Sequence, residues 1–118
     1  WLESFLSGEE SPADVQATLL QVTVEAIARA VITYCSGAAE IYLCGGGARN
    51  GLLLARLRVA LAGKKVDLTD VLGVDADSLE AFAFAWLAQQ TMLGQPGNLP
   101  AVTGAKHPCV LGAIYPAG

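Results

Sequence analysis

Three adjacent glycines stand where an apolar run gives way to a leucine-rich one. The stretch reads IYLCGGGARNGLLL and spans residues 41–54. Glycine has no Cβ, so its backbone admits a flat ring or a phosphate at close range, and each glycine costs conformational entropy on folding. One glycine would serve a tight turn between two elements. Three in a row therefore predict a loop that binds a ligand through its backbone.

A single carboxylate opens the most apolar part of the chain. Glu80 stands immediately before the run 81–94, which contains no charged residue. Spacing alone favours a structural role, because Asp77 as helix N-cap and Glu80 three places on make a capping box. Three aromatic side chains in this region are predicted to pack in the core: Phe82, Phe84 and Trp86.

The residues around the glycines predict a strand–turn–helix unit. Residues 40–44 are a short apolar run of β-formers, predicted to be a buried strand, and 65–68 are a second one. A helix is expected between them, over 50–61. A strand that ends in glycines and leads into a helix directs backbone N–H groups toward the carboxyl edge of a sheet, where α/β folds bind ligands.

Two longer helices flank this unit. Ser11 is a natural N-cap and Pro12 suits the first helical position, so a helix is expected from there to near Ser36. Another is predicted over 76–93, followed by a long Gly/Pro-rich loop. Residues 109–116 close the sequence as a strand or a short helix. This order predicts an α/β fold, with a short, mainly parallel sheet packed by three helices.

Composition narrows the class of protein. The chain has 118 residues, which suffice for one domain, and a formal net charge of −4. Its longest basic run is the pair 64–65, so neither nucleic acid nor an anionic membrane surface is expected as a partner. The longest apolar run, 81–88, is too short to span a membrane. Three well-separated cysteines suit a reducing cytoplasm better than a disulfide framework or a zinc site.

Known nucleotide motifs fit the glycine turn only in part. A dinucleotide fingerprint needs G-x-G-x-x-G, whereas Gly45, Gly47 and Asn50 give G-x-G-x-x-N. Asp67, at the end of the next predicted strand, stands at a suitable spacing for a ribose contact. Half of a Rossmann dinucleotide-binding oxidoreductase therefore stays open as an alternative. A P-loop is excluded, because no Gly-Lys-Ser/Thr follows the glycines.

Three segments, in order, make the chain similar to a known family. YLCGGGARNGLLLARL, DSLEAFAFAWLA and GNLPAVTGAKHPCVLGAIYPAG resemble the C-terminal part of anhydro-N-acetylmuramic acid kinases. These are sugar kinases of the actin/Hsp70/hexokinase superfamily, with a ribonuclease-H-like fold in two lobes. The resemblance spans nearly the whole chain and is strongest from Ile41 to Pro116. It departs at Gly51, where a proline is expected to open the helix.

The resemblance implies one site for ATP and another for a sugar. The glycine turn would let the nucleotide lie against the backbone, with an amide placed to bond to it. Arg49 would meet a phosphate or be merely solvated. The family places a sugar-contacting glutamate in the segment that contains Glu80. The resemblance therefore implies that Glu80 binds the sugar, as an alternative to capping the helix. The implied nucleotide-contacting residues are Gly45, Gly46, Gly47, Arg49 and Asn50.

The implied reaction uses ATP, with Mg²⁺, to phosphorylate the 6-hydroxyl of 1,6-anhydro-N-acetylmuramic acid while water opens the anhydro ring. The product is N-acetylmuramic acid 6-phosphate, in cell-wall recycling. No catalytic residue is identified here: the chain offers no match to the family's catalytic aspartate or first phosphate-binding turn.

Residues 1–118 are therefore expected to form a single domain, an incomplete C-terminal nucleotide-binding lobe. Without the N-terminal lobe, which would hold most of the Mg²⁺ contacts, this piece is expected to be inactive. The start WLESFL, without an initiating Met, and a hydrophobic content of 53% suit part of a longer protein. The sequence does not decide whether the protein forms a homodimer. An alternative function is that of a non-catalytic ATPase or regulator of the same superfamily, which would have no use for Glu80.

Overall fold

The computed structural model describes residues 1–116 and divides into two compact units. The first is Trp1–Ala76 and the second is Asp77–Gly118, whose last two residues lie outside the described part. The first unit contains the sheet and the glycine turn, and the second contains Glu80. Each unit is described by itself below.

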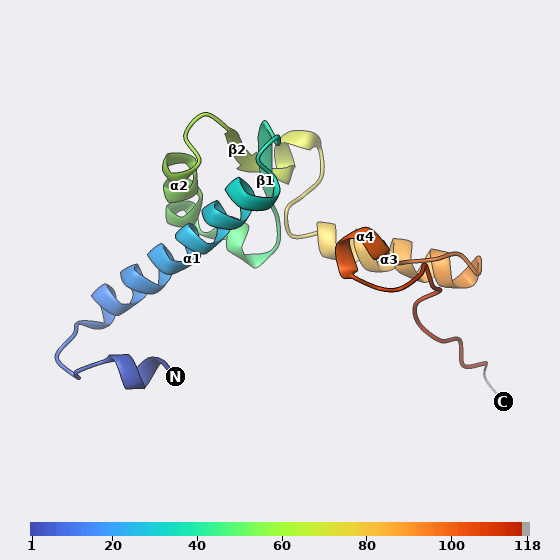
Figure 1. Ribbon diagram of the computed structural model, residues 1–118, viewed down its shortest axis with the longest axis horizontal. Helices are drawn as coiled ribbons and strands as arrows, with labels where there is room; N and C mark the ends of the chain where they lie inside the picture. The colour runs from blue at the N-terminus through green and yellow to red at the C-terminus, as the bar shows by residue number, and fades with distance from the viewer. Residues whose placement is uncertain (117–118) are drawn as a thin grey trace. The chain divides into compact units, whose positions relative to one another are not determined.

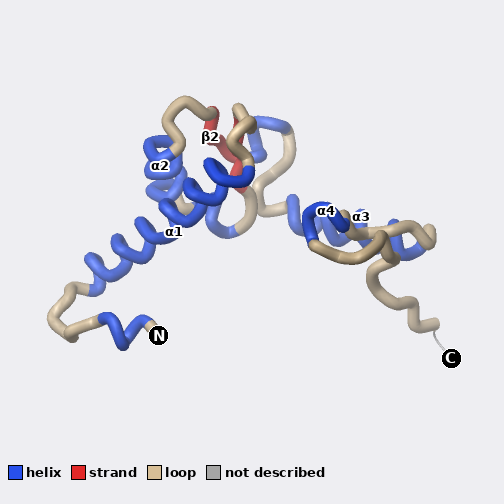
Figure 2. The backbone as a smooth tube through the Cα atoms, viewed as in Figure 1, coloured by secondary structure: helices blue, strands red, loops and turns tan. Residues whose placement is uncertain are grey.

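The first unit contains a two-stranded parallel sheet. Its strands are β1, Glu40–Leu43, and β2, Lys65–Leu68, paired in register along their whole length. The helix α2, Gly51–Ala60, connects them (Figure 1 and Figure 2). The predicted parallel pairing is confirmed, and the predicted strand bounds agree to within one residue.

The long helix α1, Pro12–Tyr34, precedes the sheet. Its start is confirmed: the Ser11 hydroxyl oxygen accepts the backbone N–H of Asp14 at 3.1 Å and donates its own proton to the Asp14 carboxylate at 2.8 Å. These contacts satisfy a backbone donor that the first helical turn would otherwise leave without a partner. The helix ends two residues before the expected position at Ser36.

The sequence was expected to contain no stretch long enough to span a membrane, and α1 corrects this expectation. Among the described residues it is a helix long and apolar enough, by length and composition alone, to cross a bilayer. A mostly buried core helix passes the same test, whereas only 11% of the most apolar stretch of α1 is buried. In α1, Val24 and Ala28 are buried in the core of the first unit. Glu25 and Arg29 lie in its middle, where charges would be costly in lipid.

One hydrophobic core holds the first unit together. It joins side chains of α1, of β2 and of α2 with its C-terminal cap: Val24, Ala28, Leu53, Leu57, Leu61 and Val66. Leu57 is only 1% exposed. Ile41 and Leu43 of β1 pack against the same cluster. The core therefore fixes which face of the sheet is covered.

The second unit consists of a helix and the loop that follows it. The helix α3 spans Leu79–Met92 and begins three residues later than predicted. A short helix, α4, Pro100–Thr103, lies inside the predicted loop. Asn98 closes this loop, because its side chain donates to the His107 carbonyl at 3.2 Å and accepts the Cys109 backbone N–H at 2.7 Å.

Two expectations for the second unit are wrong. Its tail forms neither strand nor helix over residues 109–116, because the described part of this unit contains no strand to pair with. Phe82, Phe84 and Trp86 were expected in the core, yet they are 63%, 64% and 51% exposed. α3 is apolar on every side, and one helix with one loop is too small to cover all of it.

Candidate functional site

The glycine turn lies at the carboxyl end of β1, as the sequence predicted. Residues Gly46–Arg49 form a single 3-10 turn that leads through Asn50 into α2. Because β2 runs parallel to β1, both strands end at the same edge of the sheet. Ligands of α/β folds bind at this edge.

The three glycines have different structural environments. Gly45 has φ +75° and ψ −170°, a conformation that side chains strongly disfavour, and its N–H donates to the Ala76 carbonyl at 2.7 Å. A Cβ on Gly46 would meet no atom within 4 Å, whereas one on Gly47 would lie 3.5 Å from the Leu53 side chain. Gly45 therefore shapes the turn, Gly47 sits against α2, and the space over Gly46 is open.

Asn50 is the N-cap of α2. Its side-chain oxygen accepts the backbone N–H groups of Leu52 and Leu53, both at 3.1 Å. The resemblance implies that this amide bonds to a nucleotide. Since the side-chain oxygen already accepts two hydrogen bonds in the cap, Asn50 would contact a nucleotide by donating from its NH₂ group. Arg49 ends the 3-10 turn and is exposed.

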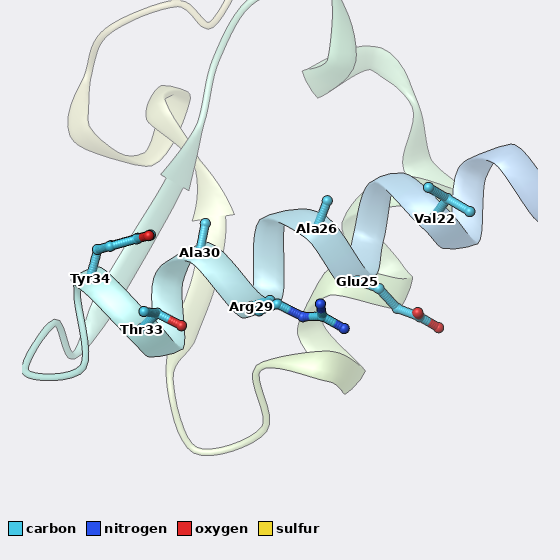
Figure 3. A pocket seen from close by; sticks show the side chains of 7 residues that line it. All are labelled: Val22, Glu25, Ala26, Arg29, Ala30, Thr33 and Tyr34. Atoms are coloured by element: carbon cyan, nitrogen blue, oxygen red, sulfur yellow. The ribbon is translucent and has the colours of Figure 1, made fainter. Parts of the chain in front are cut away.

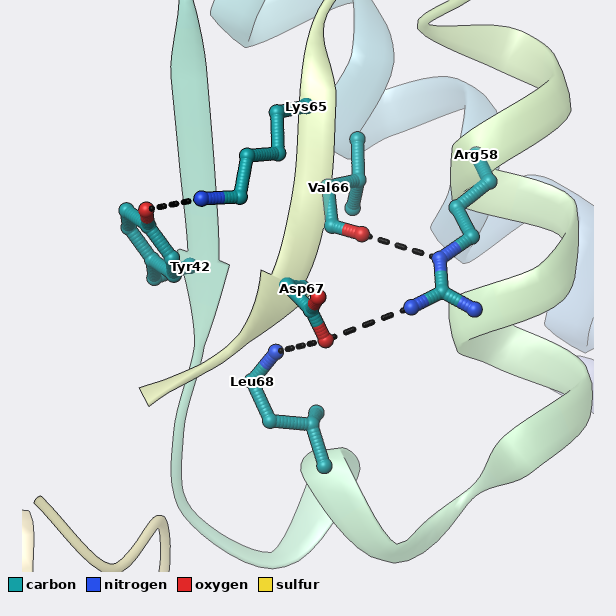
Figure 4. A network of polar contacts seen from close by, with 6 residues as sticks. All are labelled: Tyr42, Arg58, Lys65, Val66, Asp67 and Leu68. Carbon is teal, nitrogen blue, oxygen red and sulfur yellow. Dashed lines mark hydrogen bonds and ion pairs between the residues drawn. The ribbon is translucent and has the colours of Figure 1, made fainter. Parts of the chain in front are cut away.

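Asp67 is held at the outer edge of β2 by Arg58. The Arg58 guanidinium donates to the Asp67 carboxylate at 3.2 Å and to the Val66 carbonyl at 2.9 Å (Figure 4). The same carboxylate oxygen accepts the Leu68 backbone N–H at 2.9 Å. A dinucleotide site would need Asp67 directed at the glycine turn and a third parallel strand. The described residues form a sheet of two strands, so the Rossmann alternative loses its support.

A second polar group lies at the other end of the strands. Lys65 donates to the Tyr42 hydroxyl at 3.1 Å (Figure 4). That hydroxyl in turn donates to the Glu40 carboxylate. The Tyr42 hydrogen bond, together with the Glu40 charge, raises the pKa of Lys65 above its usual value. Glu40 and Lys65 begin their strands, so this group is remote from the carboxyl edge. It ties the two strands together at their exposed amino ends.

Glu80 lies in the first turn of α3 without the predicted capping box. The N-cap is Ser78 instead of Asp77, and it makes no side-chain cap hydrogen bond. Glu80 is exposed, and its carboxylate has no hydrogen bond or ion pair within the described residues. The capping interpretation is therefore wrong, because the helix starts too late for it.

A surface hollow along α1 is not a comparable site. It is lined by residues of that helix alone (Figure 3): Val22, Glu25, Ala26, Arg29, Ala30, Thr33 and Tyr34. Ligand pockets gather a few converging polar groups within a concave, mostly enclosed surface. The groups along α1 lie side by side on one helix, with no second element of the described fold over them.

Comparison with known proteins points to one family. A family model described as anhydro-N-acetylmuramic acid kinase matches residues 1–117. A curated protein of that name from Nitrosospira multiformis is 68% identical over 117 residues, which cover 99% of this chain and 32% of the relative. Its namesake from Nitrosomonas europaea is 56% identical with the same coverage. The chain thus spans about a third of the length of these relatives. It belongs to the anhydro-N-acetylmuramic acid kinase family.

Proposed function

We propose that this chain supplies the nucleotide-contacting lobe of a cytoplasmic, ATP-dependent kinase. The kinase would phosphorylate 1,6-anhydro-N-acetylmuramic acid with ring opening, giving N-acetylmuramic acid 6-phosphate in cell-wall recycling. One observation carries the proposal: the glycine turn lies at the carboxyl end of β1 and leads through Asn50 into α2. The short parallel sheet with its helices would be part of the C-terminal lobe of a ribonuclease-H-like fold.

The nucleotide would lie against the backbone of the glycine turn. No side chain projects from Gly46, so a flat ring can approach the main chain there. Asn50 would donate a hydrogen bond from its NH₂ group, and the Arg49 guanidinium would offset phosphate charge. Mg²⁺ would be held by the ATP phosphates and mainly by parts of the kinase outside this chain.

The sugar would be recognised in part by Glu80. A carboxylate accepts hydrogen bonds from sugar hydroxyls, and Glu80 is exposed with no partner within the described fold. Such charge-assisted bonds are worth about 1.5–3 kcal/mol each. A non-catalytic relative of the superfamily would have no such use for the residue. Whether Glu80 binds the sugar therefore distinguishes the proposed kinase from a non-catalytic ATPase or regulator.

Phosphoryl transfer depends on positioning and on neutralising charge around the transferred group. This chain offers a surface for the nucleotide and one carboxylate for the sugar, with no candidate catalytic aspartate. We therefore expect activity only in the full-length kinase, with this piece inactive by itself.

In the full-length kinase, Gly46→Ala should raise the KM for ATP by about tenfold, equivalent to about 1.4 kcal/mol. The added methyl meets nothing within 4 Å in the fold, so the melting temperature and the sugar KM should hardly change. Steady-state kinetics with each substrate varied, and a thermal melt, would check this. Gly37→Ala, also in open space, is the matched control. An unchanged ATP KM in Gly46→Ala would place the nucleotide elsewhere.

Two substitutions of Asn50 should separate its cap from its ligand contact. Asn50→Ala removes the acceptor for Leu52 and Leu53 and should cost about 0.5–2 kcal/mol of stability. Asn50→Asp keeps that acceptor, so its stability should match the parent's. The Asp variant places a negative charge where phosphate is proposed and should weaken ATP binding severalfold. Denaturant unfolding and ATP titration would test both. Parental ATP affinity in Asn50→Asp would contradict a phosphate near this residue.

Glu80→Gln should leave the melting temperature nearly unchanged, because this carboxylate has no partner within the described residues. It should lower kcat/KM for the anhydro sugar by about tenfold or more, since each lost 1.4 kcal/mol is a factor of ten. ATP affinity should hardly move. Kinetics with a calorimetric ATP titration would provide the check. If the variant melts earlier yet turns the sugar over normally, Glu80 serves only the helix.

A further inference from the structure

The outer edge of β2 is the edge that faces away from β1. The backbone N–H of Lys65 donates to the Ala39 carbonyl at 2.9 Å, so the main-chain groups of Lys65 point toward β1. Main-chain groups alternate in direction along a strand, so those of Val66 and Leu68 point away from β1. The described residues form a sheet of two strands, in which no other strand lies beside this edge.

Two side chains occupy the main-chain groups in the middle of this edge. Arg58 Nε donates to the Val66 carbonyl at 2.9 Å, and the Asp67 carboxylate accepts the Leu68 N–H at 2.9 Å (Figure 4). Arg58 also donates to Asp67 at 3.2 Å, which holds the two side chains together. A neighbouring strand would need both the Val66 carbonyl and the Leu68 N–H, whichever direction it ran. Both groups already have partners.

An open edge at β2 would attract another strand. Unpaired main-chain groups along a sheet edge are a template for pairing with a further chain. Val71 and Leu72 follow β2 and are 55% and 57% exposed, so they would add apolar contact to such a pairing. A second copy of the chain carries the same segment, which makes it the partner most readily available at high concentration.

We propose that Arg58 and Asp67 block strand addition at the outer edge of β2 and so prevent copies of the kinase from associating through it. Charged side chains at sheet edges are a common protection against such pairing. The Arg58 side chain is 51% exposed and that of Asp67 is 31% exposed, so both can be replaced without opening the core. Neither residue is proposed to contact the nucleotide or the sugar, so association can be measured separately from activity.

Two substitutions of Asp67 in the full-length kinase test the proposal. Asp67→Ala leaves the Leu68 N–H without its acceptor and takes from Arg58 its carboxylate partner. Asp67→Asn is the matched control, because its side-chain oxygen can still accept the Leu68 N–H.

A second pair of variants opens the same edge from α2. Arg58→Leu leaves the Val66 carbonyl without its side-chain donor. Arg56→Leu, on the same helix, is the control, because Arg56 donates to the Ala17 carbonyl of α1 at 3.3 Å and not to β2. Thermal melts would show that all four variants fold.

Sedimentation over a series of protein concentrations would measure association. With rising concentration, the mass of Asp67→Ala and of Arg58→Leu should reach at least about twice that of the parent. Asp67→Asn and Arg56→Leu should match the parent. Hydrogen exchange in the associated variants should be slowed in the peptide covering residues 65–70. If both opened variants keep the parent's mass, or associate without protection of that peptide, the proposal is overturned.

A labelled peptide with the sequence of residues 64–72 gives a test on the unaltered kinase. It should not bind there, because the Val66 carbonyl and the Leu68 N–H are occupied. Binding of this peptide to the parent, with slowed exchange over residues 65–70, would overturn the proposal even if the opened variants failed to fold.

Discussion

The parallel pairing of β1 with β2 over one core places the glycine turn at the carboxyl edge of the sheet. Leu57 and Val66 lie in that core, and Ile41 packs against it, so the covered face of the sheet is set by burial. Because the strands run in the same direction, the chain leaves both at one edge. The glycine turn follows β1 there, the segment leading to α3 follows β2, and the Gly45–Ala76 bond joins the two.

The run of three glycines combines distinct requirements. Gly45 supplies a backbone conformation with positive φ, Gly46 leaves space, and a Cβ added to Gly47 would lie 3.5 Å from the Leu53 side chain. In the proposed kinase, the nucleotide would lie against the backbone at Gly46, where no side chain projects. Asn50 completes the turn by starting α2, so the residues that would contact ATP also begin the helix that fills the core.

The sequence predicted those elements that depend on nearby residues. β1, α2 and β2 are apolar runs bounded by glycines and caps, and their expected bounds agree closely with the structure. The sequence could not predict the Gly45–Ala76 hydrogen bond or the hydrogen bonds from Arg58 to β2, because no local pattern signals contacts between distant residues. α3 begins three residues later than predicted, and its N-cap is Ser78, although the adjacent Asp77 was expected there. That error also produced the capping interpretation of Glu80.

The most direct test is a crystal structure of the full-length kinase with a non-hydrolysable ATP analogue and the anhydro sugar. The account predicts the adenosine part of the analogue in van der Waals contact with the Gly46 Cα, at roughly 3.5–4 Å, with the Asn50 oxygen still capping α2. Finding the analogue bound with no atom near residues 45–50 would contradict it.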